Sequence, residues 1–355
     1  MPDVKDALEK SNKKGNIILS EQEVQGLKPV ENGNKKKLTS LQQRVITAIC
    51  YVVVWIAMCA LKWCAPLGNV PGGWGSIGFD LVFTAVSVIG AYEFLRAIDR
   101  SESGINCKIS LPQRAITIAF CAMAVPLFAI VEMAMNGGLL ALTCAFTVYV
   151  MFLAATSVFD YRRSSVKATI YCVFCMLYCG VLSGVLSAIN HLDNNSMAAI
   201  LVVFVCTVFT DSGAFIVGSS LKRFVPMKLA PQLSPNKTVI GAIGGIIGGV
   251  LGAILVYYGM YYLGGVNGNV FLTSFNGVGL TIRSETFPAL LSFVLVGLAT
   301  SVMAQIGDLF ESAIKRECGV KDMGKCLPGH GGVLDRFDSM LYCSVVVLIS
   351  FGTII

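Results

Sequence analysis

Long apolar runs, separated by short polar segments, dominate the pattern of this chain. A helix needs about 17–25 mostly apolar residues to cross the roughly 30 Å hydrocarbon core of a bilayer. Nearly all of the runs reach that length, so the pattern predicts an all-α polytopic integral membrane protein with about nine transmembrane helices. The runs are residues 45–63, 79–95, 115–133, 139–156, 169–189, 198–217, 239–263, 287–306 and 340–355.

Residues 1–44 differ from the rest, because they are polar, rich in Lys and without a long apolar run. Such a segment cannot bury enough apolar surface to fold by itself. We expect a disordered cytoplasmic tail over 1–44 and one membrane domain over 45–355. The 355-residue chain is 55% hydrophobic and 14% charged, with a mean hydropathy of +0.72. An ordinary soluble domain is about 25% charged, so a soluble globule, a nucleic-acid-binding module and a secreted disulfide scaffold are excluded.

The Lys and Arg residues indicate how the chain crosses the membrane. Cytoplasmic loops retain Lys and Arg. If the N-terminus is cytoplasmic, only Lys62 and Arg283 of the 27 Lys and Arg residues fall on the opposite side. We therefore expect a cytoplasmic N-terminus and an outer C-terminus, and we attribute the net charge of +6 to this sidedness.

Thirteen Cys residues raise the question of a metal or redox site. Most lie within apolar runs, where a free Cys behaves as a small hydrophobic residue. Cys172 and Cys175 form a C-x-x-C pair, but no second pair or His follows at zinc spacing. Cys318, Cys326 and His330 offer three zinc ligands on paper, and we favour the hydrophobic interpretation for the set as a whole.

A row of glycines marks one predicted helix. In lipid, small residues at this spacing let two helix backbones approach closely. A nucleotide-binding glycine loop is the weaker alternative, because no strand is predicted before the row. The glycines are Gly241, Gly244, Gly245, Gly248, Gly249 and Gly252.

The predicted cytoplasmic loop 307–339 combines acids, cations and glycines at a membrane boundary. Charges at such a boundary are costly unless they have partners or a function. Carboxylates with cations suit phosphoryl or nucleotidyl transfer, since carboxylates hold Mg²⁺ and cations neutralise the charge that builds up on phosphate oxygens. The candidates are Asp308, Asp335 and Asp338 for metal binding, Lys315, Arg316, Lys321 and Arg336 as phosphate clamps, and Gly331 and Gly332 as backbone phosphate contacts. We favour His330 as a phosphate or structural hydrogen-bond partner over a catalytic base.

A second constellation surrounds the loop 218–238. Asp211 lies inside the preceding apolar run, and an acid at membrane depth is a functional candidate by default. Ser234 and Thr238 are typical helix caps, with Pro235 near the first turn of the next helix. A helix N-terminus also binds phosphate through its free N–H groups, and Lys237 would reinforce that binding. Capping and phosphate contact are compatible.

These motifs, taken together, resemble one enzyme family. The run from Ser312 to Asp338 reads S-x-x-K-R, then K-D, then P-G-H-G-G, then D-R-x-D. Upstream come D-x-x-A-F-x-x-G from Asp211 to Gly218 and S-P-x-K-T from Ser234 to Thr238. Over about residues 45–355 the chain resembles the bacterial phosphatidate cytidylyltransferases, also called CDP-diacylglycerol synthases.

The resemblance implies a membrane enzyme that joins CTP and phosphatidate to give CDP-diacylglycerol and pyrophosphate. It implies Mg²⁺, with a second, monovalent cation such as K⁺ as an option, and it makes a homodimer plausible. It further implies a bacterial cytoplasmic membrane with the active-site loops on the cytoplasmic side, and no nucleic-acid partner. The implied roles are metal ligands at Asp308 and Asp335; catalysis by Asp211, Lys237, Lys321, Asp322, His330, Arg336 and Asp338; and substrate binding by Ser234, Thr238, Ser312, Lys315, Arg316, Gly331 and Gly332.

The chain departs from the family pattern at two places. Ile240 stands where an acid usually precedes Gly241, and Val239 replaces the usual aromatic residue. Ser219 and Ser220 follow Gly218 without the second glycine often seen there. Two alternatives stay open: a CTP-dependent enzyme acting on a polyisoprenoid alcohol or another lipid phosphate, and a membrane transporter that binds phosphate or a nucleotide. Transporters generally place their ionisable groups near the bilayer midplane, whereas this cluster lies at one interface.

Overall fold

Long helices make up most of the computed structural model. It describes residues 49, 52–62, 73–101, 107–160, 165–192, 196–221, 223–224, 226–267, 289–327 and 331–353. A π-helical segment, Met176–Val181, joins α7 and α8 into one continuous helix. The elements are α4 (Gly73–Arg100), α5 (Leu111–Met135), α6 (Gly138–Phe159), α7 (Val166–Cys175), α8 (Leu182–Asn190), α9 (Ser196–Leu221), β1 (Lys228–Ala230), β2 (Ser234–Thr238), α10 (Val239–Asn267), α12 (Ala289–Glu317) and α13 (Leu334–Thr353).

Within the described residues, seven helices are long and apolar enough to cross a membrane. This supports an all-α integral membrane protein, while the predicted count of nine is not confirmed. The run 45–63 corresponds to a shorter apolar helix, Val52–Lys62. The last run corresponds to α13, which begins six residues earlier than predicted and carries Asp335, Arg336 and Asp338 in its first turns. The tail 1–44 and Arg283 lie outside the described residues.

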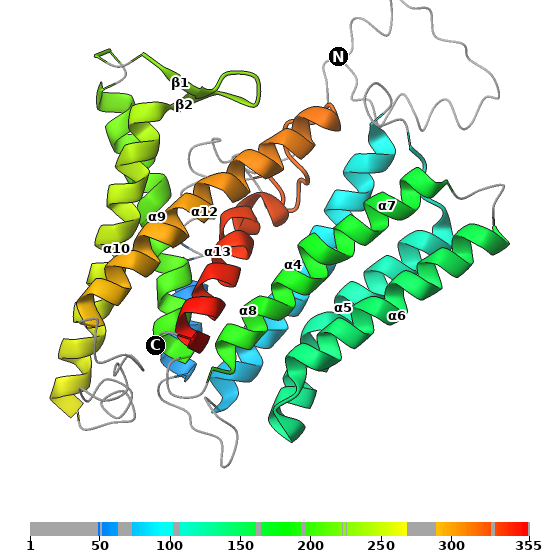
Figure 1. Ribbon diagram of the computed structural model, residues 1–355, viewed down its shortest axis with the longest axis horizontal. Helices are drawn as coiled ribbons and strands as arrows, with labels where there is room; N and C mark the ends of the chain where they lie inside the picture. Colours follow the sequence, from blue (N-terminus) through cyan, green and yellow to red (C-terminus); the bar gives the residue numbers. More distant parts are fainter. Residues whose placement is uncertain are drawn as a thin grey trace, which may run out of the picture. The chain divides into compact units, whose positions relative to one another are not determined.

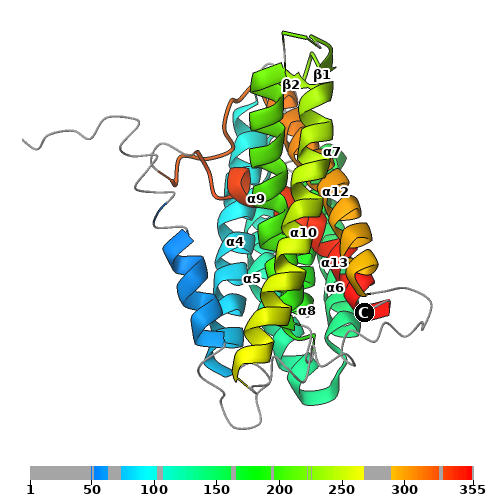
Figure 2. The same cartoon turned by 90° about the vertical axis from the view of Figure 1, so that its left-hand side faces the viewer.

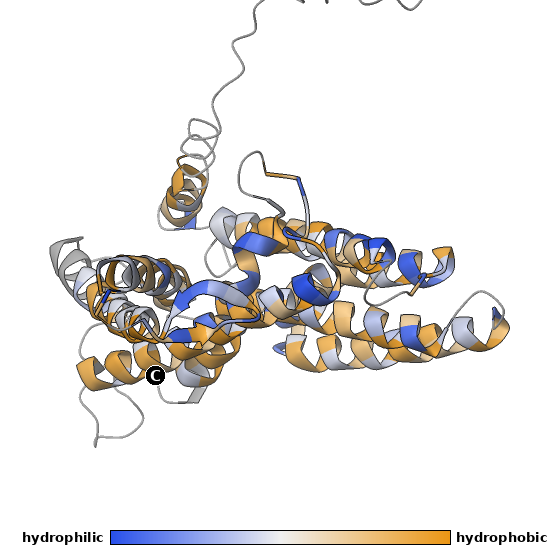
Figure 3. Ribbon diagram, turned by 90° about the horizontal axis from the view of Figure 1, so that it is seen from above, coloured by the Kyte–Doolittle hydropathy of each residue, from blue (hydrophilic) through white to orange (hydrophobic). Residues whose placement is uncertain are grey.

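The helix surfaces are those expected in lipid. Figure 3 shows apolar residues, in orange, over much of the outside of the helices. On α6, for example, Leu140, Met151 and Phe159 are largely exposed. A soluble protein rarely exposes such large apolar areas, so the exposed faces are consistent with contact with acyl chains.

Glycines bring α9 and α10 into direct backbone contact, as the sequence predicts. The two helices run side by side in Figures 1 and 2. A Cβ atom on Gly248 would lie 2.3 Å from the carbonyl oxygen of Phe209, and one on Gly213 would lie 2.5 Å from that of Gly244. Side chains at these positions would force the helices apart. This contact fixes one wall of the site described below.

A buried polar network fastens the helix Val52–Lys62 to the bundle. The Lys62 Nζ atom donates to the side-chain oxygen of Asn190 at 2.6 Å. Asn190 in turn donates to Asp80 on α4 at 3.0 Å, and His191 Nε2 lies 2.8 Å from the other Asp80 oxygen. Trp55 is buried and stacks on Phe204 of α9, with ring centroids 4.6 Å apart. The short helix is thus held beside α4, where Figure 2 shows it in blue.

Candidate functional site

A pocket of about 730 Å³ opens where α9, the β1–β2 hairpin, α10 and α12 meet. The hairpin and the ends of α9 and α12 lie at the same end of the bundle (Figure 1). Sequence segments more than ninety residues apart therefore share one cavity. Its lining includes five of the predicted site residues: Asp211, Ser234, Lys237, Thr238 and Asp308.

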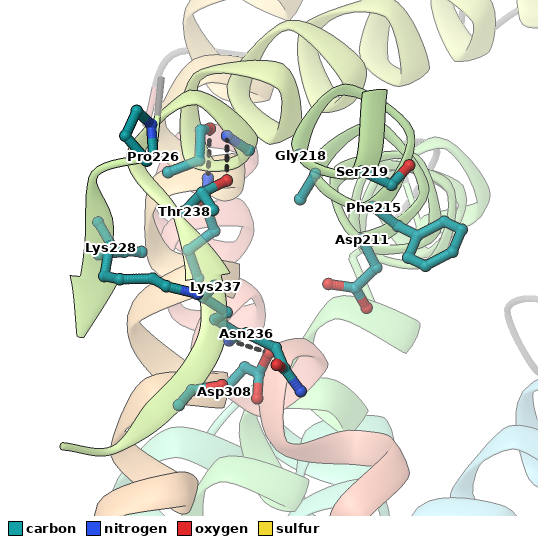
Figure 4. Close-up of a pocket in the computed structure, with 16 residues that line it drawn as sticks. Asp211, Phe215, Gly218, Ser219, Pro226, Lys228, Asn236, Lys237, Thr238 and Asp308 are labelled. Carbon is teal, nitrogen blue, oxygen red and sulfur yellow. Dashed lines mark hydrogen bonds and ion pairs between the residues drawn. The ribbon is translucent and has the colours of Figure 1, made fainter. Parts of the chain in front are cut away.

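Three charged side chains face one another across this pocket. Lys237, on β2, forms an ion pair with Asp308 on α12. Asp211 projects from α9 toward the same space (Figure 4). Asp211 makes no direct hydrogen bond or ion pair with any other described side chain. The pocket thus presents one free carboxylate opposite a carboxylate that is already neutralised by an ammonium group.

The segment 228–238 forms a hairpin over the pocket rather than the first turn of a helix. β1 and β2 pair antiparallel, with Lys228 opposite Thr238. The expected place of Pro235 in the first turn of α10 is therefore wrong, because Pro235 lies within β2. The expected cap at Thr238 is confirmed, since its Oγ1 accepts the Gly241 N–H at 3.1 Å. This hydrogen bond satisfies one of the free N–H groups at the start of α10.

Arg316 supports the hairpin from outside the pocket. Its Nε atom donates to the carbonyl oxygen of Leu233, in the turn between β1 and β2, at 3.2 Å. Lys228 donates to the carbonyl oxygen of Pro235 at 2.6 Å. We expected Arg316 to bind substrate, but the structure engages it with the protein backbone.

The first eleven residues of the predicted loop, from Gly307 to Glu317, belong to helix α12. Asp308, Ser312, Lys315 and Arg316 are therefore helical, where the hydropathy pattern predicts a loop. Residues three or four positions apart share a helix face. Asp308, Glu311 and Lys315 consequently form one polar stripe that runs from the pocket toward the loop 318–333.

Asp335 is the centre of a second polar cluster. Its side chain is only 2% exposed. Its two carboxylate oxygens accept hydrogen bonds from Lys315 Nζ at 2.9 Å, the Gly332 N–H at 2.7 Å and the Met323 N–H at 3.1 Å. Lys315 also pairs with the buried Glu311 at 2.6 Å. These contacts hold both ends of the loop 318–333 against α12.

The electrostatics of Asp335, which lies outside the seven candidate spans, favour the charged carboxylate. Burial alone would raise the pKa of this group. The Lys315 ammonium and the N–H groups of Gly332 and Met323 outweigh burial and hold the pKa of Asp335 below its ordinary value. Hydrogen bonds to a charged form stabilise that form, so the loop is tied down by an ionised side chain.

Two buried acids of this region escaped the sequence-based candidates. Glu93 of α4 is 4% exposed and accepts the Leu334 N–H at 3.0 Å. A Cβ atom on Gly324 or Gly332 would collide with its carboxylate. Glu311 of α12 is fully buried beside Lys315 and Asp338. The signal that could have found Glu93 is an acid inside a predicted span, because such acids rarely lack a role.

The remaining candidates occupy several environments. Asp338 is buried beside Glu311, and Lys321 and Asp322 are exposed on the loop. Gly331 has a φ of 86°, a left-handed backbone that favours glycine. Gly332 directs its N–H to Asp335, so this N–H is engaged within the protein. Ser312 is half-buried, Arg336 lines an apolar cavity beside α4, and His330 lies outside the described residues.

The chemistry of the pocket suits a divalent ion that a phosphate group helps to hold. Mg²⁺ usually binds one or two carboxylates, together with substrate phosphates and waters. Asp211 and Asp308 line one cavity and could supply these carboxylates. Asp335, the other predicted metal ligand, instead directs its oxygens to Lys315 and to backbone N–H groups. No group of three or more acidic, His or Cys side chains among the described residues is arranged to hold a metal without such help.

Comparison with known proteins identifies the family. The cytidylyltransferase family model matches residues 42–354. The phosphatidate cytidylyltransferase of Bacillus subtilis (strain 168) is 29% identical over 308 residues, which cover 86% of this chain and 95% of that protein. Proteins of the same name from Staphylococcus haemolyticus and Staphylococcus aureus (strain COL) are 33% and 34% identical, over 54% and 52% of this chain and 62% and 60% of their own lengths. The chain belongs to the cytidylyltransferase family.

Proposed function

We propose that this protein is a phosphatidate cytidylyltransferase, which converts CTP and phosphatidate to CDP-diacylglycerol and pyrophosphate. Family membership and the names of the relatives support the reaction. The observation that carries the proposal is the pocket in which Asp211, Lys237 and Asp308 meet beside the start of α10. Such a set of charges fits a triphosphate and its metal ion.

The residues of the pocket would act mainly by position and charge. A phosphate oxygen of phosphatidate attacks the α-phosphorus of CTP, the bond to the β-phosphate oxygen breaks, and pyrophosphate leaves. Lys237 would neutralise charge on the transferring and leaving oxygens, and the hairpin would keep Lys237 over the pocket. Preorganised charges of this kind commonly contribute more to catalysis than any other single effect. A phosphate nucleophile is already an anion, so the pocket needs no strong base.

Mg²⁺ is the metal proposed for this site. Asp211 and Asp308 would hold it together with the phosphates of CTP. When bound, it would supply charge neutralisation and orientation of the phosphates. A monovalent cation such as K⁺ and a homodimer remain predictions from the family resemblance.

The proposed orientation places the pocket on the cytoplasmic side. The loops 218–238 and 307–339 around it carry nine of the 18 Lys and Arg residues outside the N-terminal tail, which agrees with the positive-inside rule. CTP would then reach the pocket from the cytosol, and phosphatidate would approach from the inner leaflet.

The test is turnover by the purified full-length protein. Labelled CTP, phosphatidate and Mg²⁺ should yield a liponucleotide and pyrophosphate in equal amounts. Formation of CDP and a new lipid monophosphate from a lipid alcohol would instead show a kinase, and absence of any CTP-dependent product would refute the proposal.

Two substitutions test the site itself. Asp308→Asn and Asp211→Asn should each reduce kcat by about 100-fold or more, the scale expected when a preorganised charge is lost. Glu317→Gln, at the exposed end of the same helix α12, is the matched control and should stay near the parent. Near-parental turnover of both Asp variants would remove the pocket from the reaction.

A further inference from the structure

The pocket that contains Asp211, Lys237 and Asp308 is called the nucleotide pocket below. A separate, apolar groove runs beside α4. It has a volume of about 240 Å³ and lies between the helix Val52–Lys62, α4 and the start of α13. Its lining includes Trp55, Phe79, Val86 and Phe337. Phe79 and Ile89 mark its extent along α4, ten positions or about 15 Å apart. That length matches one leaflet, half of the roughly 30 Å hydrocarbon core.

A basic pocket of about 470 Å³ adjoins the groove at the end of α4 that faces the loop 318–333. Arg96 and Arg100 of α4 and Lys325 of the loop line it. None of the three forms an ion pair with another described residue. Arg96 does contact Tyr92, through a hydrogen bond of 3.3 Å and the face of the ring. Three cations outnumber the two acids of the lining, Glu93 and Asp322, so the cavity carries a net positive charge that suits an anion.

The groove and the basic pocket form one amphipathic cleft. Both are lined by Ile89, and the loop passes from Lys325 in the basic pocket to Leu327 in the groove. Figure 2 shows the short helix, in blue, standing beside α4. An apolar channel of leaflet length that ends at cations without ion pairs is complementary to a lipid with an acyl chain at one end and a phosphate headgroup at the other.

The acids of the basic pocket favour a phosphate monoester over a diester. Glu93 and Asp322 also line it. One Glu93 oxygen accepts the Leu334 N–H, and the other, Oε1, is buried without a hydrogen-bond partner. A phosphate monoester has a second pKa of about 6 and therefore carries a P–OH group part of the time at neutral pH. That group can donate to the exposed carboxylate of Asp322, whereas a phosphodiester has no such proton and would face the carboxylate with charge alone.

We infer that this cleft is the entry site for a lipid phosphate monoester, with an acyl chain in the groove and the phosphate among Arg96, Arg100 and Lys325. The inference rests on the proposed function, which makes phosphatidate the natural occupant. Arg336 links the cleft to the nucleotide pocket, because it lines the groove and also interacts electrostatically with Asp211.

Direct binding to the full-length protein in detergent, without CTP, tests the inference apart from catalysis. The probe is a phosphatidate with a photoreactive diazirine in one acyl chain, and crosslinked peptides are mapped by mass spectrometry. Crosslinks should fall within residues 52–62 and 79–89. Crosslinks confined to the outer faces of α5 and α6 would overturn the inference.

Substitutions separate the two halves of the cleft. The triple variant Arg96→Gln, Arg100→Gln, Lys325→Gln should weaken phosphatidate binding at least tenfold, and Lys108→Gln, an exposed cation outside the cleft, should not. Ala85→Trp should block the groove and weaken binding by a similar factor, because Ala85 is exposed and lines it. Leu140→Trp, at a largely exposed position on α6, is its control. CTP binding should stay within twofold of the parent in every variant, and unchanged phosphatidate affinity in both cleft variants would refute the inference.

Competition identifies the occupant. Unlabelled phosphatidate should displace the probe, whereas phosphatidylglycerol, inorganic phosphate and CTP should displace it at least tenfold less well. Equal displacement by phosphatidylglycerol would refute the preference for a monoester, and displacement by CTP or phosphate alone would refute a lipid site. Crosslinking in the cleft without any turnover would uphold the site and reject the proposed function. Turnover by the parent, with unchanged phosphatidate affinity in the cleft variants, would uphold the proposed function and reject the cleft as the lipid site.

Discussion

Replacing Asp335 by Asn tests whether this residue holds the loop 318–333 or binds a metal ion. The two carboxylate oxygens of Asp335 accept hydrogen bonds from Lys315, Met323 and Gly332. Asn keeps one acceptor oxygen but turns an amide N–H₂ toward at least one of these donors and removes the charge. The variant therefore leaves a buried donor without an acceptor and Lys315 with Glu311 as its remaining counterion.

The expected loss of stability is large. A buried donor left unsatisfied costs about 1–3 kcal/mol, and breaking a buried ion pair costs about 3–5 kcal/mol. Because Lys315 keeps its pair with Glu311, we place the total near the lower end of that second range, at about 3 kcal/mol. A chain of this size shifts its melting temperature by roughly 2 °C per kcal/mol. The apparent melting temperature should therefore fall by about 6 °C.

Thermal unfolding in detergent and limited proteolysis measure this effect. Asp335→Asn should unfold earlier than the parent and be cut faster within residues 318–333. Asp322→Asn is the control for stability, since Asp322 is an exposed acid on the same loop. A melting temperature within about 1 °C of the parent, together with a changed Mg²⁺ requirement, would refute the structural role and restore Asp335 as a metal ligand.

Two further substitutions test how the walls of the nucleotide pocket are built. Gly248→Ala should destabilise the protein by about 1–3 kcal/mol, because the new Cβ atom would lie 2.3 Å from the Phe209 carbonyl oxygen. Gly259→Ala on the same helix is the control and should be neutral or slightly stabilising, since nothing lies within 4 Å of its new Cβ atom. Equal melting temperatures of the two variants would contradict the backbone contact. Thr238→Ala should cost about 1 kcal/mol through loss of the cap on Gly241, whereas Thr238→Ser should retain it; a Ser variant as unstable as the Ala variant would show that the cap contributes nothing.

Hydropathy predicted the long helices well, because lipid leaves a spanning segment few options besides a helix. It failed at their ends. The apolar run of α12 stops near residue 306, but the helix continues to Glu317 because Asp308, Glu311 and Lys315 find partners on its inner face. Hydropathy averaged over a window of residues assigns such charged segments to a loop, because the average does not depend on which helix face the charges occupy.

The motifs predicted which residues matter more reliably than where they lie. The motifs at residues 211–218 and 234–238 do meet the Asp308 side chain in one pocket. Sequence spacing could not show that Asp322 and Arg336 line cavities on the other side of the loop. It also gave Glu93 no motif, although this acid contacts the segment that carries the glycines. Such assignments depend on contacts between helices far apart in the chain, which a single sequence does not encode locally.

Helix α12 makes the chain length between Asp308 and Lys315 as strict a requirement as the residues themselves. An α-helix turns by about 100° and rises by about 1.5 Å for each residue. One inserted residue between these positions would swing Lys315 away from Asp335 while Asp308 stayed beside Lys237. Asp308 and Lys315 could then no longer face the nucleotide pocket and Asp335 at the same time, even if every side chain were retained. Helical geometry thus forbids insertions here.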